Sequence, residues 1–594
     1  MKNLNNIAAF TFIFLLSLTF LSCNKDTTIT KPNIILIMTD DQGYGDFGFM
    51  GNPLIETPNI DALAERSAQM TNFYVSPVCA PTRASLMTGR YNYRTRAVDT
   101  FLGRAMMDTE EITIAEIMRD AGYATSIFGK WHLGDNYPMR PQDQGFDEVL
   151  VHRGGGIGQE SDPVGGEGKY TNPILFHNGE QVTENGFCTD IYFNKAMKWI
   201  EEKKNEEKPF FVYLSTNTPH TPVADVPDEL YQKYKKLNLN NNQFPQSSGH
   251  PLPEESDTDR RARIYAMITN IDQNMGKLFS KLSDLEITDN TMVIFLTDNG
   301  PNGNRYVAGM RGYKTMVYEG GIRSPLLIQW SNGKLKPKIR INKVAAHIDL
   351  LPTILEACEI ALPNNHQIDG ESFLPLLRGV EIELVDRSIV LQAHRGNKPV
   401  PYHNFALRTN NWKLLHSSGF RKESFTGDPQ FELYDMNNDP LEMTNLAMSK
   451  PEIVNQLKMK YDEWYTDVSS TRVDNYTAPR IPIGTVYENP VVLTRQDWQQ
   501  ISENPWLEHA TGYWRLKASE NTTYTILIRF RKKEISGEVI LKINNKIYKK
   551  KLVLGKNEIV FESINIPEGD IDLQAQLQFS KCKVIGSWQV EVKK

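Results

Sequence analysis

The chain has 594 residues, which is too long for one ordinary domain, so we expect one large domain and at least one smaller one. Hydrophobic residues make up 40% and charged residues 23%, the balance of a folded globular protein, and the formal net charge of −6 argues against a nucleic-acid-binding protein. Five cysteines are too few for a disulfide scaffold at this length.

Residues 1–22 are predicted to be a signal peptide. Lys2 is followed by an apolar run, residues 7–21, which is too short to span a membrane. The run ends in Ser22-Cys23 before polar residues, and this junction resembles the lipobox of bacterial lipoproteins, which implies a lipid on Cys23. A plain secretory signal is the alternative. Both interpretations export the protein, and the first anchors it in the bacterial cell envelope, at the outer membrane, periplasm or cell surface.

Buried strands alternate with helices between residues 23 and 380. Continuous apolar runs are typical of strands buried on both faces of a parallel sheet, and they occur at 33–38, 210–215, 291–297 and 325–330. A shorter strand is predicted at 124–128. Helices are predicted at 59–69, 81–88, 112–121, 190–204 and 260–285. The alternation predicts an α/β fold, a doubly wound, mostly parallel sheet with helices on both faces, as the catalytic domain.

The pattern changes at residue 381. Residues 381–470 contain antiparallel-type strand segments at 405–416 and 431–434 and an amphipathic helix at 451–466. We therefore expect a small α+β subdomain that packs on the main sheet.

The last part of the chain differs in composition from the rest. Residues 471–505 are rich in Pro and Asn and are predicted to be a linker. Short alternating strands in residues 506–594 indicate an additional all-β, sandwich-like domain. Residues 521–594 carry 14 Lys and Arg against 8 Asp and Glu, so this domain either holds an anionic glycan, for example through Lys549–Lys551, or packs with a solvated basic face.

The most informative segment runs from Cys79 to Arg90. Pro81 suits the first turn of a helix and Gly89 suits its end, so Cys79 is predicted at a helix N-terminus, where free N–H groups and the helix dipole favour an anion. Arg83 lies about one helical turn further along, on the same face. A nucleophile position beside a guanidinium at a helix N-terminus suits a tetrahedral oxyanion.

This segment resembles the signature of a known enzyme family. Cys79-x-Pro-x-Arg83, followed by Leu86-x-x-Gly-Arg90, is similar to the signature of the formylglycine-dependent type I sulfatases of the alkaline phosphatase superfamily. The resemblance covers residues 32–466. It implies that a maturation enzyme oxidises Cys79 to formylglycine (3-oxoalanine), whose aldehyde hydrate attacks the sulfur of a sulfate ester.

Two acidic pairs follow predicted strands and suggest a metal site. Asp40-Asp41 and Asp298-Asn299 each follow a buried strand, and both pairs are expected at the carboxyl edge of the sheet, where ligands bind. Three carboxylates and one amide oxygen form a hard, all-oxygen site that suits Ca²⁺, with Mg²⁺ as the alternative. The resemblance implies that these four residues and the oxygens of residue 79 ligate the metal.

Further cations and histidines follow the same family order. Lys130-Trp131-His132 follows the strand at 124–128, His220 follows the strand at 210–215, and Lys314 precedes the strand at 325–330. The resemblance implies that His132 takes the proton of the hydrate and that His220 or Lys314 protonates the bridging oxygen. It also implies a set of residues that contact the sulfate: Arg83, Lys130, His220 and Lys314.

An exported lipoprotein with this signature resembles bacterial enzymes that desulfate polysaccharides. The expected substrate is a sulfated carbohydrate, with the algal glycan ulvan first and carrageenan or a glycosaminoglycan as alternatives. Arg104, Arg153 and Arg408 are expected either to contact a second anionic group or to be structural. A phosphonate monoester or phosphodiester hydrolase with the same nucleophile is an alternative function. A non-catalytic glycan-binding surface lipoprotein is another, but it predicts loss of Cys79, Arg83 or a metal ligand, and the sequence retains them all.

Overall fold

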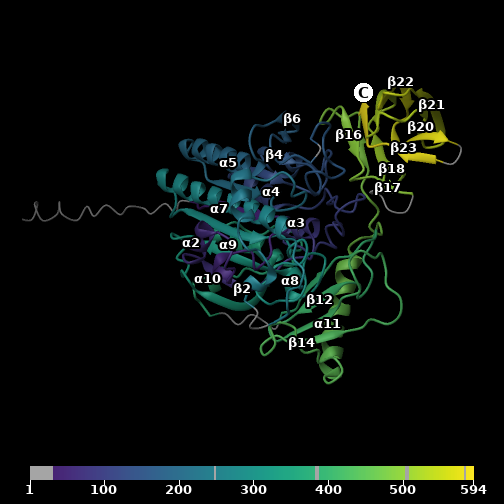
Figure 1. Ribbon diagram of the computed structural model, residues 1–594. Coiled ribbons are helices and arrows are strands. Elements are labelled where there is room, and N and C mark those ends of the chain that lie inside the picture. The colour runs from purple at the N-terminus through teal and green to yellow at the C-terminus, as the bar shows by residue number, and fades with distance from the viewer. Residues whose placement is uncertain are drawn as a thin grey trace, which may run out of the picture.

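The computed structural model describes residues 31–166, 168–245, 249–364, 366–381, 387–501, 507–580 and 583–594. The predicted signal peptide and Cys23 lie outside the described residues. Among the helices that are described, none has the length and apolar character needed to cross a membrane. The chain forms three parts in sequence: a large α/β body, a small α+β subdomain beside it, and a C-terminal β domain (Figure 1).

A ten-stranded sheet forms the centre of the body, in the order β10-β2-β9-β8-β1-β7-β3-β4-β5-β6. The five central neighbours β8-β1-β7-β3-β4 are parallel, as predicted, whereas β9 runs antiparallel to β8 and β2, and β5 and β6 form an antiparallel edge. The strands are β1 (Asn33–Thr39), β2 (Ala68–Tyr74), β3 (Ala124–Lys130), β4 (Glu148–His152), β5 (Ile174–His177), β6 (Glu180–Thr183), β7 (Phe210–Ser215), β8 (Thr291–Thr297), β9 (Arg323–Gln329) and β10 (Arg340–Ala346).

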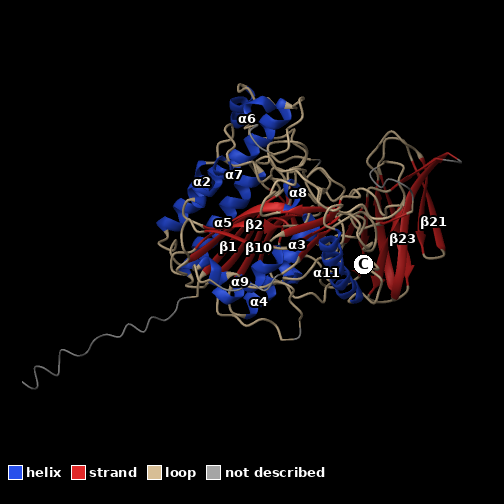
Figure 2. Ribbon diagram, turned by 90° about the horizontal axis from the view of Figure 1, so that it is seen from below, coloured by secondary structure: helices blue, strands red, loops and turns tan. Residues whose placement is uncertain are grey.

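Helices cover both faces of this sheet (Figure 2). Alternate residues of β1 point to opposite faces: Leu36 packs with one set of helices and Ile37 with the other. The first set is α3 (Cys79–Thr88), α4 (Ile114–Asp120), α9 (Leu350–Ala357) and α10 (Leu374–Leu377); the second is α2 (Pro58–Ala64), α5 (Cys188–Asn205) and α7 (Thr258–Asp284). Every residue of β1, β3, β7 and β8 is buried, which explains the long apolar runs of β1, β7 and β8.

Shorter elements complete the body. α6 (Asp228–Lys235) packs on α7, and α8 (Glu319–Ile322) directly precedes β9. Four 3₁₀ turns lie in the connections: η1 (Gly48–Met50), η2 (Pro141–Gln144), η3 (Asn241–Gln243) and η4 (His347–Asp349).

The α+β subdomain has the predicted composition. Four antiparallel strands, β11 (Ile389–Gln392), β12 (Phe405–Arg408), β13 (Trp412–His416) and β14 (Glu432–Asp435), form one sheet, and α11 (Pro451–Ser470) covers it. Leu457 and Tyr461 of α11 pack against Phe405, Leu407 and Leu433 of the strands.

The C-terminal β domain is built from two facing sheets, β15-β18-β23-β20-β21 and β16-β25-β19-β22, in which all pairs are antiparallel except β15 with β18. β17 pairs with β18, and β24 pairs with β23. The strands are β15 (Ile481–Ile483), β16 (Val491–Thr494), β17 (Gln499–Gln500), β18 (Gly512–Ala518), β19 (Thr522–Arg529), β20 (Gly537–Ile543), β21 (Lys546–Leu552), β22 (Glu558–Ile566), β23 (Gly569–Ser580), β24 (Lys583–Gly586) and β25 (Gln589–Lys593).

The predicted linker, residues 471–505, is corrected by the structure. It contributes β15, β16 and β17, and β15 pairs with β18 while β16 pairs with β25. These strands have only two to four residues, so they show almost no alternation in the sequence, and they form because the larger sheets supply their hydrogen-bonding partners. The apolar residues Ile481, Ile483 and Leu493 are buried in the core of the domain.

The β domain shares its hydrophobic core with the body. Phe101, Leu102, Met106 and Met139 of the α/β body belong to the same buried cluster as Trp498 and the sheet residues of the β domain. The two parts therefore pack as one unit rather than as separate modules joined by a flexible segment.

The segment 481–494 offers a direct test of its role in the core. Leu493 is fully buried, whereas Val486 in the same segment is 93% exposed. We expect Leu493→Ala to lower the free energy of unfolding by about 2–5 kcal/mol, because it leaves a cavity in the shared core. Val486→Ala should change it by less than about 0.5 kcal/mol. Denaturant unfolding measures both, and equal small effects would mean that the segment is a linker after all.

Candidate functional site

The predicted site residues come together at the carboxyl edge of the parallel strands. Asp40 and Asp41 follow β1, Asp298 and Asn299 follow β8, and Lys130 is the last residue of β3. His132 and His220 lie in the loops after β3 and β7, and Cys79 is the first residue of α3. All of these side chains are buried, as is that of Arg83. The topology of neighbouring parallel strands thus gathers residues that are up to 259 positions apart.

Buried carboxylates form a cluster at the centre of this edge. Ligand atoms of Asp40, Cys79 and Asp298 lie within 4.8 Å of one another, and so do those of Asp40, Asp41 and His220. The backbone N–H of Asp41 donates to Asp298 Oδ1 at 3.1 Å. Asp41 has a φ of 63°, a left-handed conformation that costs a non-glycine residue energy and that turns two successive carboxylates toward one point.

The cluster has the donor set of a hard cation. Within this cluster, three buried oxygens have no hydrogen-bond donor among the described residues: Asp40 Oδ1, Asp41 Oδ2 and Asn299 Oδ1. Asn299 donates its Nδ2 to Asp41 Oδ1 at 2.8 Å, which leaves its carbonyl oxygen available. Buried acceptors rarely remain unpaired, so these oxygens fit an oxygen-ligated divalent ion.

Three cations surround the carboxylates. Lys130 Nζ lies 2.6 Å from Asp40 Oδ2, Lys314 Nζ lies 2.6 Å from Asp41 Oδ1, and Arg83 Nη2 donates to Asp298 Oδ2 at 3.0 Å. Each carboxylate therefore has its own cationic partner.

Burial and the nearby charges shift the pKa values of Asp40 and Asp298 in opposite directions. Burial by itself raises the pKa of Asp40, but Lys130 and the other nearby cations outweigh burial and hold this pKa below its usual range. Burial raises the pKa of Asp298 well above its usual range, and the negative charge of Asp40 adds to the shift. A cation bound beside Asp298 would favour the ionised form of this carboxyl group.

Cys79 sits where the sequence predicted, at the start of α3, with 3% of its surface exposed. Its Sγ occupies the position that the sequence motif predicts for the nucleophile. Thr82 Oγ1 donates to Asp298 O at 2.7 Å and ties α3 to the end of β8. Arg83 also donates to the Lys130 carbonyl at 3.3 Å and to Ser215 Oγ, so its guanidinium joins the ends of β3, β7 and β8.

The two histidines are held as opposite tautomers. His132 Nε2 lies 2.7 Å from the Thr100 carbonyl, so Nε2 carries the proton and the buried Nδ1, which has no partner among the described residues, carries the lone pair. His220 instead places Nδ1 2.6 Å from the Thr221 carbonyl, and its Nε2 lies 3.7 Å from Asp41 Oδ2. Burial lowers the pKa of both rings, that of His220 to about 4, so both are neutral near pH 7.

A glycine loop, residues 154–156, closes over both rings. A Cβ on Gly155 would lie 2.9 Å from His132 Nε2, and a Cβ on Gly156 would lie 2.8 Å from His220 Cε1. Only glycine allows this approach. The Gly-Gly-Gly run was visible in the sequence, but nothing in it indicated which side chains it would cover.

Sequence reasoning missed a contribution from the β domain. Gln496 donates its Nε2 to the Thr100 carbonyl at 2.8 Å, the same oxygen that accepts from His132. The backbone N–H of Gly103 donates to Gln496 O at 3.0 Å, which fixes this loop a second time. No periodicity or motif connects Gln496 to His132 in the sequence.

The three additional arginines have different environments. Arg153 lies over the Phe176 ring at 3.8 Å and 3.6 Å from Glu488, and Arg408 is buried and donates to Tyr74 Oη at 2.9 Å, so both make structural contacts. Arg104 lies in the wall of a groove, which is described below.

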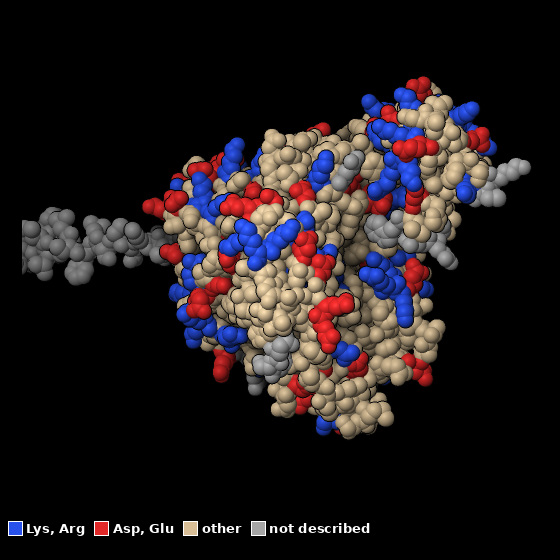
Figure 3. Space-filling view, in the orientation of Figure 1, with Lys and Arg blue, Asp and Glu red and all other residues tan. Residues whose placement is uncertain are grey.

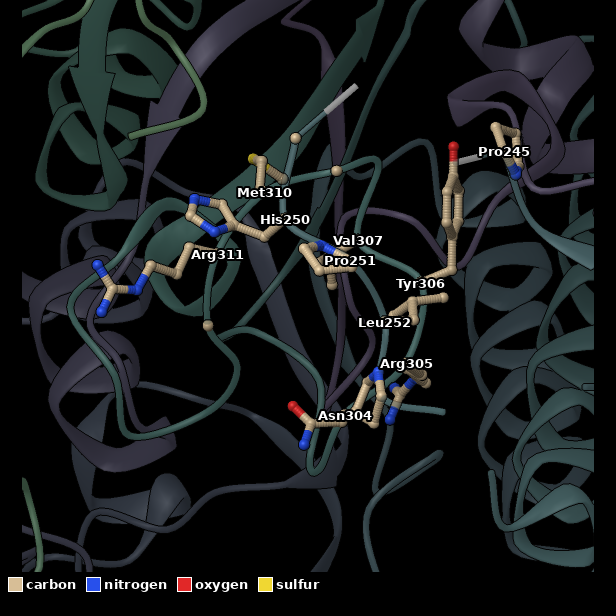
Figure 4. A pocket seen from close by; sticks show the side chains of 14 residues that line it. Pro245, His250, Pro251, Leu252, Asn304, Arg305, Tyr306, Val307, Met310 and Arg311 are labelled. Carbon is tan, nitrogen blue, oxygen red and sulfur yellow. The ribbon is translucent and has the colours of Figure 1, made fainter. Parts of the chain in front are cut away.

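A cavity of about 200 Å³ adjoins the site (Figure 4). Its wall includes His250, Tyr306, Arg305 and Arg311. Arg305 donates to the Asp41 carbonyl at 2.6 Å and to Asp46 Oδ2 at 2.7 Å, so the same wall supports the strained Asp41.

The fold and the site together define the class of the protein, an α/β hydrolytic enzyme whose buried carboxylate cluster has the donor set for a divalent cation. The chain belongs to the sulfatase family: the family model described as Sulfatase matches residues 32–360, and the model described as N-sulphoglucosamine sulphohydrolase, C-terminal, matches residues 311–467. Both matches end before the C-terminal β domain.

Known relatives agree with this assignment. Human arylsulfatase A is 30% identical over 474 residues, which cover 72% of this chain and 86% of the relative. An ulvan-active sulfatase of Formosa agariphila is 29% identical over 75% of this chain and 85% of its own length. The crystal structure of Ps i-CgsB in complex with k-i-k-neocarrahexaose superposes with a TM-score of 0.62 at 28% identity, over 74% of this chain and 93% of that chain. The protein is a sulfuric ester hydrolase that acts on sulfated sugars.

The carboxylate cluster predicts that a divalent cation stabilises the fold. At about 100 times its Kd, Ca²⁺ should add about 2.7 kcal/mol of stability, seen as a higher Tm that a chelator reverses. Asp298→Asn should shrink this Ca²⁺-dependent shift. Asp272→Asn, which alters an equally buried carboxylate of α7 that accepts hydrogen bonds from Asn59 and Ile60 of α2, should retain the shift. An equal shift in both variants would place the cation elsewhere, and a larger shift with Mg²⁺ would overturn the preference for Ca²⁺.

The Gln496 contact predicts that the β domain positions His132. Gln496→Ala should lower kcat about 10–100-fold with KM nearly unchanged, because the Thr100 carbonyl loses one of its two fixed donors. Gln589→Ala is the matched control, since Gln589 is equally buried and donates across the same domain boundary to the Asp162 carbonyl at 2.8 Å. Steady-state kinetics on one sulfated substrate decides the matter: equal losses in both variants would indicate general loosening of the boundary.

Proposed function

We propose that the protein removes sulfate groups from a marine algal polysaccharide or its oligosaccharides, with ulvan as the first candidate. The proposal also includes a formylglycine made from Cys79, a bound Ca²⁺ and a lipid anchor on Cys23 in the bacterial cell envelope. The ulvan-active relative and the carrageenan-oligosaccharide complex support an algal glycan. A sulfated glycosaminoglycan is the alternative substrate, because a Bacteroides thetaiotaomicron N-acetylgalactosamine-6-O-sulfatase is also similar, at 28% identity.

The observation that carries the proposed chemistry is the convergence of Cys79, the oxygen cluster and three cations at one sheet edge. Once present, the formylglycine and the metal supply an oxygen nucleophile and positive charge against the sulfate. Asp40, Asp41, Asp298 and Asn299 would hold the metal.

The remaining roles follow from the geometry of this chain. Lys130, Lys314 and Arg83 direct positive charge at the position of residue 79, and they bind sulfate oxygens as negative charge develops. His132 accepts a proton at Nδ1, because its Nε2–H is held by the Thr100 carbonyl. Lys314 donates a proton to the bridging oxygen of the leaving sugar. The contact of His220 Nδ1 with the Thr221 carbonyl assigns the proton to Nδ1, so Nε2 presents a lone pair and orients a donor rather than acting as one.

A panel of defined sulfated oligosaccharides from ulvan, carrageenan and glycosaminoglycans tests this function. We expect sulfate release to be fastest on an ulvan oligosaccharide and Cys79→Ala to lower kcat by at least ~10³-fold, because the nucleophile is lost. Cys188→Ala, which removes a buried thiol of α5 outside the site, should leave kcat unchanged. Mass spectrometry of the peptide that contains residue 79 should show the aldehyde in place of the thiol.

Three results would contradict the proposal. If a fully active protein carried an unmodified thiol at residue 79, the formylglycine hypothesis would be wrong. Faster cleavage of an aryl phosphodiester than of any sulfate ester would favour the phosphodiesterase alternative. If only glycosaminoglycans were desulfated, a glycosaminoglycan would be the substrate instead of an algal polysaccharide.

A further inference from the structure

A groove of about 820 Å³ opens where the three parts of the molecule meet. Its wall includes Leu102–Arg104 of the body, Gly396–Lys398 of the α+β subdomain, residues 475–478 and 480, and Tyr513 and Arg515 on β18 of the β domain. In the space-filling view, Lys and Arg side chains gather on both sides of the hollow between the β domain and the parts below it (Figure 3).

Short stretches of chain connect this groove to the catalytic site. Ala393 packs with Val78, the residue before Cys79. Asn404 donates both to the Ala393 carbonyl at 2.8 Å and to the Thr315 carbonyl at 3.2 Å, next to Lys314. Lys398 is five residues beyond Ala393, so its backbone lies at most about 18 Å away. A sugar chain whose sulfate lies at residue 79 can therefore reach the groove with its next few residues.

The charges of the groove wall are not balanced. It contains five cationic side chains, Arg96, Arg104, Lys398, Arg480 and Arg515, but only two acidic ones, Glu423 and Asp572. Arg104 pairs with Glu423 at 2.8 Å and with Asp99 at 3.4 Å, and Arg480 pairs with Asp570 at 2.8 Å and with Asp572 at 3.0 Å. The other three form no ion pair with a carboxylate in the described part of the chain.

Each unpaired cation can act on a ligand in a different way. The exposed Lys398 can move to meet an anion. Arg515 donates one N–H to the Ala478 carbonyl at 2.7 Å, which holds its guanidinium in the wall. Arg96 is buried and bonds only to neutral carbonyls, those of Gly103 at 2.8 Å and Met106 at 2.7 Å among them, so its charge adds to the positive field.

The uncharged part of the wall suits a carbohydrate. Tyr513 offers an aromatic ring, and amide and hydroxyl groups come from Asn397, Asn475, Thr477 and Gln499. Amides and hydroxyls can both donate to and accept from sugar hydroxyls, and an aromatic side chain adds an apolar surface with a polar tip. A polar, partly open groove with surplus positive charge fits a flexible anionic glycan better than an apolar ligand.

We propose that this groove binds the anionic sugar residues, sulfated or uronate-bearing, that flank the reacting sulfate ester. The inference rests on the proposed function and deepens it: the protein acts on a chain of several sugars rather than on a single sulfated sugar. It assigns Arg104 to the groove and gives the β domain a part in the selection of substrate. The Lys-rich strand β21 is not this site, because Lys549 pairs with Glu538 at 2.7 Å and Lys550 donates to the Val560 carbonyl.

Charge reversal in the groove tests the proposal with full-length protein. Lys398→Glu changes an exposed side chain without an ion pair, so it should fold normally, and Arg515→Gln is the second variant. We expect each to lower kcat/KM about tenfold on a sulfated hexasaccharide and to leave a sulfated disaccharide unaffected. Lys551→Glu, an equally exposed lysine on β21, is the matched control and should change neither substrate. Added salt should reduce the preference of the wild type for the hexasaccharide.

A binding measurement separates this inference from the proposed function. In the Cys79→Ala background, calorimetry with the same hexasaccharide should give a Kd about tenfold weaker for Lys398→Glu than for Lys551→Glu. Carrageenan hexasaccharides, whose only anions are sulfates, and ulvan hexasaccharides, which also carry uronates, distinguish the two sources of charge. Equal losses on short and long substrates, or no loss of binding, would overturn the groove assignment. A wild type that binds through the groove but releases no sulfate would overturn the proposed function alone.

Discussion

The electrostatic repulsion between three buried carboxylates is the constraint on which the site depends. Unit charges about 4 Å apart repel by roughly 4 kcal/mol at an effective dielectric constant of ~20, which is comparable to the entire stability of many domains. Ligand atoms of Asp40 lie within 4.8 Å of those of Asp298 and of Asp41, and Lys130, Lys314 and Arg83 each pair with one of these three carboxylates. The proposed sulfate-binding residues are these same three cations, so one set of side chains both stabilises the carboxylates and serves the proposed chemistry.

Backbone strain at this edge is balanced by contacts from distant segments. Asp41 and His132 both have left-handed backbone conformations, with φ of 63° in each case. Arg305 holds the Asp41 carbonyl, and the Thr100 carbonyl holds the His132 ring. Strained residues persist where the surrounding structure fixes them, and here they aim a carboxylate and an imidazole nitrogen that relaxed loops would turn away.

The C-terminal β domain contributes a contact to the candidate site, although both family models end before it. It shares a hydrophobic core with the loop at residues 101–106, and Gln496 donates to the carbonyl that orients His132. Its strand β18 also forms one wall of the cationic groove. The interface between the β domain and the body therefore includes a contact that orients His132, and it also borders the groove proposed to bind the substrate.

The sequence by itself determined the elements whose signal is local. The unbroken apolar runs of β1, β7 and β8 predicted a parallel sheet, because strands buried on both faces need no polar residues. The Cys79–Arg90 motif predicted a helix that begins at the nucleophile, and strand-end acids predicted the cluster. Tertiary structure alone decided the tautomers of His132 and His220, the partnership of Gln496 with a loop 396 residues away, and the strands within residues 481–500. Each of these features depends on a hydrogen-bonding partner from a remote segment. The local sequence pattern does not indicate which remote group will be that partner.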